Sequence, residues 1–270
     1  MPSVAALLYP EALASSITLP TEILLAAGQL ARARRRGNLS TSIALLQPED
    51  GDFIQLDSGI RLQTHGRFDQ LSRCDLLLLP AIWRRPQQVQ ARCEPWLDTI
   101  QNLYASGTTI CSVGSASNLL AAAGLLDDRP ATTHWHDFDA FAKRHPRVQL
   151  KRRHLITRSD RLYCVGSVNS IADFMVHMIG QWFGDGVARS VEAQFSPEAR
   201  QNFETATFLA EAPEAHHDAV IRDVQDYLRD HFAEPLRLTE LAARQGLSER
   251  SLNRRFRQAT GSTPMAYLRD

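Results

Sequence analysis

The stretch TTICSVGSAS at residues 108–117 has the pattern of a buried strand that runs through a tight turn into a helix. Its first half is apolar and of strand length, and Gly114 places a residue without a side chain where the turn is tightest. In many α/β enzymes a turn of this kind carries a nucleophilic Cys or Ser. The segment therefore predicts the bend of a catalytic elbow that lacks a reactive side chain at its sharpest position.

Strand-like and helix-like segments alternate on both sides of this stretch. Strands are predicted over 4–9, 41–47, 74–80 and 108–113, with a hairpin over 53–65 and two strands within 154–167. Helices are predicted over 20–36, 86–107, 115–126 and 170–183. Such alternation is typical of an α/β fold, here a flavodoxin-like, mostly parallel sheet sandwiched by helices.

The composition is that of an ordinary globular protein: 270 residues, 44% hydrophobic, 22% charged, with a formal net charge of zero. No apolar run is long enough to cross a bilayer, and residues 1–9 lack the basic region of a signal peptide, so we expect a cytoplasmic protein without a membrane partner. The four cysteines have no CxxC spacing and are expected to be reduced thiols. There is no glycine-rich nucleotide motif, and we expect no cofactor and no metal.

The character of the chain changes near residue 186. We expect a sensor-like α/β domain over 1–185, a linker over 186–217 that includes the charged stretch EAPEAHHDA, and a helical domain over 218–270. The pair His216–His217 lies in this linker without a third ligand, which favours a linker over a metal site.

The helical tail has the design of a helix-turn-helix. Thr239 is predicted to cap a short helix, Gly246 permits the tight turn, and Ser248 is predicted to cap a second helix. Leu252 and Phe256 are spaced i,i+4 on the buried face of that second helix. A second helix of this kind enters the DNA major groove.

Charge on the second predicted helix points to double-stranded DNA. Arg250, Asn253, Arg254 and Arg257 share the face opposite Leu252 and Phe256. Arg pairs with guanine and Asn with adenine, while further arginines neutralise phosphates. The alternative is a solvated basic helix in an all-α appendage.

The segment LTELAARQGLSERSLNRRFRQATGSTPMAYL, within residues 218–268, resembles the first helix-turn-helix of an AraC-family DNA-binding domain. The resemblance implies that Arg250, Asn253 and Arg254 are base-reading positions. The family domain carries two such units, and this chain is expected to contain the first only, which leaves open a regulator that does not bind DNA alone.

The segment ICSVGSASNLLAAAGLLDDRPATTHW at 110–135 resembles the PfpI and class I glutamine-amidotransferase-like superfamily, and more closely the sensor domain of GlxA-type AraC regulators. The resemblance places the superfamily's nucleophilic Cys at Gly114 and the acidic residue beside it at Ser16. Gly114 has no sulfur to form a thiolate, and Ser16 has no charge to tune one. The nucleophile and the residue that activates it would therefore both be missing. We therefore predict a catalytically inactive sensor domain and not an enzyme.

A cleft is expected at the carboxyl ends of the parallel strands, whatever occupies the nucleophile position. The residues predicted to line it are Ser16, Glu22, Gly114, Ser115, His134 and Trp135. The start of the helix at residues 115–117 favours a carboxylate, and the resemblance implies an amino acid or a quaternary amine as effector. Paired DNA half-sites call for a homodimer. The alternative from another class is a PfpI-like hydrolase or hydratase that uses Cys111 or Ser115.

Overall fold

The computed structural model describes residues 2–35, 42–195, 207–209, 219–230 and 238–267. It divides into two units, Met1–Glu211 and Ala212–Asp270, each with its own hydrophobic core. The first unit extends beyond the expected boundary at residue 185 because helix α7 (Asp185–Phe195) packs on its neighbours and strand β11 (Thr207–Leu209) joins its sheet. Residues 210–218, including His216 and His217, lie outside the described residues.

The first unit is built on a seven-stranded sheet in the order β11-β9-β10-β6-β5-β1-β2. β1, β2, β5, β6 and β10 are parallel, and β9 runs antiparallel to β10. The strands are β1 (Val4–Leu7), β2 (Ile43–Leu46), β5 (Leu76–Leu79), β6 (Thr109–Val113), β9 (Ile156–Ser159) and β10 (Leu162–Val165). The predicted α/β class and mostly parallel sheet are confirmed.

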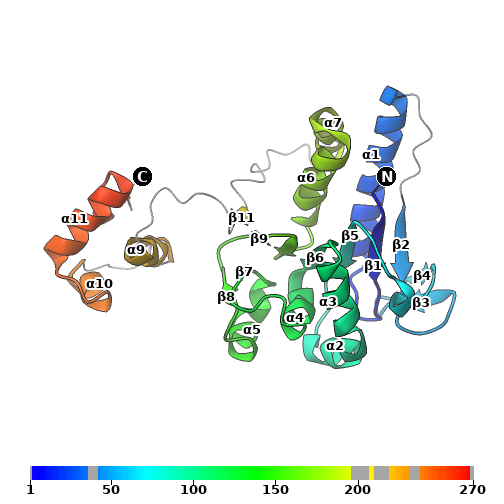
Figure 1. Ribbon diagram of the computed structural model, residues 1–270, viewed down its shortest axis with the longest axis horizontal. Helices are drawn as coiled ribbons and strands as arrows, with labels where there is room; N and C mark the ends of the chain where they lie inside the picture. The colour runs from blue at the N-terminus through cyan, green and yellow to red at the C-terminus, as the bar shows by residue number, and fades with distance from the viewer. Residues whose placement is uncertain (1, 36–41, 196–206, 210–218, 231–237, 268–270) are drawn as a thin grey trace. The chain divides into compact units, whose positions relative to one another are not determined.

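Helices cover both faces of this sheet (Figure 1). α1, α6 and α7 contact one another on one face, while α2, α3 and α4 gather on the other. Their bounds are α1 (Ser15–Arg35), α2 (Pro86–Cys93), α3 (Leu97–Ala105), α4 (Ser117–Ala122) and α6 (Ile171–Phe183), with the short α5 (Phe138–Arg144). Two small two-stranded sheets complete the unit: β3 (Phe53–Gln55) with β4 (Arg61–Gln63), and β7 (Pro130–Ala131) with β8 (Gln149–Leu150).

Apolar runs explain the central strands. All four residues of β1 and all four of β5 are buried, as expected for strands covered on both faces. Two helices differ from their predicted boundaries, and each contains or adjoins a proline. α1 begins at Ser15 and contains Pro20, and the helix expected over 86–107 is broken by a 3₁₀ turn at Glu94–Trp96, which includes Pro95.

The connections of the sheet diverge between β1 and β5. β1 leads through α1 to β2 on one side, whereas β5 leads through α2 and α3 to β6 on the other side. β1 and β5 are themselves neighbours in the sheet. In open α/β sheets a crevice forms at such a switch point, beyond the carboxyl ends of the strands.

The second unit contains α9 (Ala219–Asp230), α10 (Leu238–Arg244), α11 (Glu249–Thr260) and α12 (Pro264–Tyr267). Among the described residues, its core consists of Ile221, Val224, Leu228, Leu241, Ala242, Leu252 and Phe256. Gly246 has φ +64, and the Ser248 hydroxyl accepts the Ser251 N–H at 3.2 Å, so the predicted turn and second cap are confirmed. Thr239 lies inside α10, which begins at Leu238, so the predicted cap at Thr239 is wrong.

Within the described parts of the chain, no helix has both the length and the apolar character that a membrane span requires.

Candidate functional site

Gly114 forms the sharp bend between β6 and α4, as predicted. Its φ is +55, in the left-handed region that other residues adopt only with strain. A Cβ built at this position would lie 3.6 Å from the Ala81 Cβ and 3.8 Å from the His134 Cβ, which are ordinary contacts. The elbow therefore has room for a small side chain, and glycine relieves the backbone strain that such a side chain would impose.

Both serines predicted to line the cleft are buried and hydrogen-bonded to the backbone. The Ser115 hydroxyl donates to the Ile82 carbonyl at 3.1 Å. The Ser16 hydroxyl donates to the Leu13 carbonyl at 2.6 Å and accepts the Ala81 N–H at 3.0 Å. Ser16 thus joins the loop after β1 to the loop after β5, where a carboxylate could not donate a hydrogen bond.

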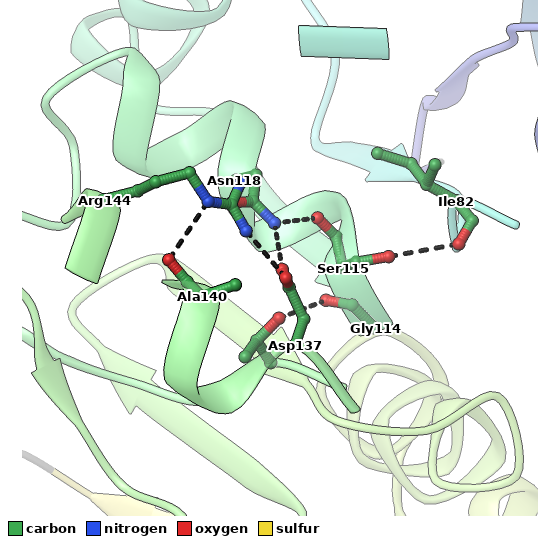
Figure 2. A network of polar contacts seen from close by, with 8 residues as sticks. Ile82, Gly114, Ser115, Asn118, Asp137, Ala140 and Arg144 are labelled. Atoms are coloured by element: carbon green, nitrogen blue, oxygen red, sulfur yellow. Dashed lines mark hydrogen bonds and ion pairs between the residues drawn. The ribbon is translucent and has the colours of Figure 1, made fainter. Parts of the chain in front are cut away.

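A polar network anchors the elbow to α5 (Figure 2). The Asn118 amide donates to the Ser115 carbonyl at 2.7 Å and to the Asp137 carboxylate at 2.8 Å. Arg144 closes the network with bonds of 2.7 Å to the side-chain oxygens of both Asn118 and Asp137. Since Asn118 is fully buried, the network holds the elbow in one conformation. This network was not predicted from the sequence, where its signal is a polar Asn within an apolar helix.

His134 and Trp135 follow β7 and lie beside one another, with ring centroids 5.5 Å apart. Burial lowers the pKa of His134, so its imidazole is neutral at physiological pH. Trp135 is 70% exposed, and Glu22 is exposed on α1. Neither Trp135 nor Glu22 is among the residues that line the cavity at the switch point.

That cavity has a volume of about 550 Å³, within the range of small-molecule sites. It opens between the loop after β1 and the loop after β5, where the topology predicts a crevice. The lining residues are Glu11, Ala12, Leu13, Asp57, Ser58, Trp83, Arg84, Arg85, Gln88 and Arg92. None of the six residues predicted from the sequence is among them.

Backbone and side-chain bonds fix the walls of the cavity. The Trp83 N–H donates to the Glu11 carbonyl at 2.7 Å, and the Leu13 N–H donates to the Ala81 carbonyl at 2.8 Å. The buried Tyr9 hydroxyl donates to the Pro80 carbonyl. Glu11, in the loop after β1, and Arg92, on α2, form an ion pair at 2.8 Å. The cavity is therefore largely preformed. The sequence signal that could have predicted its lining is the set of charged residues that follow the buried strands β1 and β5.

All four cysteines are buried, including Cys111. Burial raises the pKa of all four thiols. The pKa of Cys74 rises to about 11 and that of Cys93 to about 12, and those of Cys111 and Cys164 are also raised. A thiol with a raised pKa is protonated near neutral pH and is a poor nucleophile. The described residues also contain no group of three or more His, Cys, Asp or Glu that could hold a metal ion.

We expect a thiol-reactive probe at neutral pH to leave the native protein unlabelled, because thiolate forms only as pH approaches the raised pKa values. Intact-protein mass spectrometry checks this, with the protein in concentrated urea as the control that should gain four labels. Rapid labelling of Cys111 in the native protein would contradict an inert thiol.

The predicted DNA-reading residues lie together on α11. Leu252 and Phe256 are fully buried, and Arg250, Arg254 and Arg257 are exposed on the other side of the helix. A groove of about 330 Å³ is lined by Asn253, Arg254, Arg257, Gln258 and Thr263. The helix thus presents guanidinium and amide groups on one accessible face, which suits contacts with bases and phosphates.

Residues 228–269 match the model of bacterial regulatory helix-turn-helix proteins of the AraC family. The chain is 29% identical over 221 residues to the HTH-type transcriptional regulator CdhR of Pseudomonas aeruginosa, covering 81% of this chain and 64% of CdhR. It is 30% identical over 170 residues to the HTH-type transcriptional regulator GlxA of Rhizobium meliloti, covering 61% and 51%. Residues 228–269 thus match an AraC-type helix-turn-helix, and the chain is similar to GlxA-type regulators along 51–64% of their length.

Solved structures share the fold of much of this chain. A crystal structure of an AraC family transcriptional regulator from Pseudomonas putida superposes with a TM-score of 0.56 at 22% identity, covering 73% of this chain and all of that one. The isonitrile hydratase of Pseudomonas putida is 28% identical over 152 residues, 56% of this chain and 61% of the enzyme. The chain is thus similar both to regulators and to an enzyme.

Proposed function

We propose that this chain is a transcriptional regulator that reads double-stranded DNA with α11 and senses a small molecule in its α/β unit. The observation that carries the proposal is the exposed face of Arg250, Asn253, Arg254 and Arg257 on a capped helix whose opposite face is buried. In this geometry the early residues of the helix reach base edges, and the remaining arginines contact phosphates.

Arg254→Ala is expected to weaken binding to the chain's own operator by roughly 10- to 100-fold, because one lost base contact costs about 1–3 kcal/mol of discrimination. Binding to random DNA should fall far less. Fluorescence anisotropy on DNA from its own upstream region, run as a salt titration, measures both.

The matched control is Arg189→Ala, which removes the same charge from an exposed position on α7. Equal losses for the two variants, or equal binding of wild type to every DNA sequence, would contradict sequence reading by α11.

The sensing part of the proposal rests on the switch-point cavity together with the elbow beside it. Ser115 at the elbow and Ser16 on α1 support the cavity, since both bind the backbone of the loop after β5. We propose a non-catalytic role for this unit, supported by the glycine at the nucleophile position and by the buried thiols. The effector class implied by the resemblance, an amino acid or a quaternary amine, remains part of the proposal.

The proposal also covers the oligomeric state and the location of the protein. DNA half-sites pair with symmetric readers, so the chain is expected to act as a homodimer. A regulator that binds chromosomal DNA acts in the cytoplasm of a bacterium. The similarity to isonitrile hydratase keeps an enzyme as the second candidate, and the thiol-labelling experiment tests the form of it that uses Cys111.

A further inference from the structure

The arginines that line the switch-point cavity differ in whether an acidic side chain pairs with them. Of its three arginines, Arg92 is paired with Glu11, whose side chain is only 11% exposed. Arg84 and Arg85 have no carboxylate within ion-pair distance in the parts of the chain that the structure describes. Asp57 is the remaining acid on the wall. The lining therefore carries two consecutive arginines without an acidic partner among the described residues, together with one further carboxylate, that of Asp57.

The backbone that carries these two arginines is unusual. Arg84 has φ 61 and Arg85 has φ 50, so two consecutive non-glycine residues adopt the left-handed conformation. Pro86 disfavours the helical conformation at Arg85, but it places no such restriction on Arg84. Conformations of this kind persist where the surrounding structure imposes them, and they cluster at ligand sites. The loop is held here by the bond from the Trp83 N–H to Glu11.

Trp83 orients one of the arginines. The Arg84 guanidinium lies over the Trp83 ring, 5.3 Å from its centroid. Stacking of this type leaves the N–H groups at the edge of the guanidinium free to bind an anion. It also occupies a ring face that would otherwise suit a cationic group. The aromatic residue of the cavity therefore supports an anion site and not an aromatic cage for a cation.

We propose that Arg84 and Arg85 bind the carboxylate of a small monocarboxylic acid in this cavity. Guanidinium groups match the planar, bidentate geometry of a carboxylate. Asp57 opposes a second carboxylate, so the other end of the ligand is neutral or cationic. The inference rests on the proposed function in taking this cavity as the effector site, and it assigns the recognition to residues outside the elbow.

The test uses a matched set of four-carbon probes and isothermal titration of the full chain without DNA. Butanoate and 4-aminobutanoate are expected to bind, butanedioate more weakly, and butylammonium not at all. Replacing both arginines, Arg84→Gln with Arg85→Gln, should weaken butanoate binding by at least roughly tenfold, because two charge-assisted contacts are lost. Asp57→Asn should improve the binding of butanedioate relative to butanoate.

Arg189→Gln on α7 is the charge-matched control, and circular dichroism verifies that each variant is folded. The carboxylate site is overturned if no carboxylate binds at tens of millimolar concentration, if butylammonium binds as well as butanoate, or if the double variant binds butanoate like wild type. DNA anisotropy with and without butanoate is measured separately. Carboxylate binding without any effect on DNA affinity would uphold the site and contradict the sensing function.

Discussion

Phe256→Ala is expected to unfold the second unit of the chain and abolish its DNA binding. Phe256 is fully buried in the core of the second unit, and its ring meets that of Tyr267 edge to face at 5.5 Å between centroids. Truncating a buried Phe costs about 3–5 kcal/mol, and a unit as short as Ala212–Asp270 has little stability in reserve. The loss of α11 as a formed helix would then remove the DNA-reading face.

The distribution of tryptophan makes this result measurable. All four tryptophans (Trp83, Trp96, Trp135 and Trp182) lie in the first unit. The thermal transition followed by tryptophan fluorescence should therefore be unchanged in Phe256→Ala, while helical circular dichroism falls at low temperature.

Met265→Ala, at a position 41% exposed beside the same core, is the control and should leave both signals near those of wild type. A variant Phe256→Ala that keeps full helicity and DNA affinity would show that Phe256 does not hold the unit together.

Asp137→Asn is expected to destabilise the first unit by about 2 kcal/mol, below the 3–5 kcal/mol of a fully buried broken pair. The substitution keeps the shape of the side chain but removes the negative charge that faces Arg144. The side chains of Asp137 and Arg144 are 13% and 22% exposed, so solvent compensates only part of the loss. The elbow would lose one of its anchors, because Asn118 bonds to both Ser115 and Asp137. Tryptophan fluorescence during urea unfolding measures the change.

Asp139→Asn provides a matched control two residues away. Asp139 also pairs with an arginine, Arg152, at 2.8 Å, but its side chain is 83% exposed. Exposed pairs of this type contribute about 0–1 kcal/mol, so the control should unfold close to wild type. Similar losses in the two variants would mean that burial does not govern the strength of the Asp137 pair.

Local patterns were sufficient for the secondary structure near the middle of the sheet. An apolar run such as Leu76–Leu79 predicts a strand that is buried on both faces, as the structure has it. The turn at Gly114 needs only a residue that tolerates positive φ. The helix-turn-helix could also be predicted from the sequence, because the Ser248 cap, the Gly246 turn and the i,i+4 pair of α11 all lie within a few residues of one another. Two helix boundaries were predicted wrongly: α1 begins before Pro20 at Ser15, and the helix predicted over 86–107 is interrupted at the turn that contains Pro95.

The cavity is a different kind of feature. Glu11 and Arg92 are 81 residues apart in the chain, and the loop after β1 meets α2 only because β1 and β5 are neighbours in the sheet. The sequence by itself determined the alternating α/β pattern, the bend without a nucleophile and the reading face of α11, since each depends on short-range spacing. The tertiary structure alone decided which charged side chains surround the switch point, because strand order is set by long-range packing that no local pattern encodes.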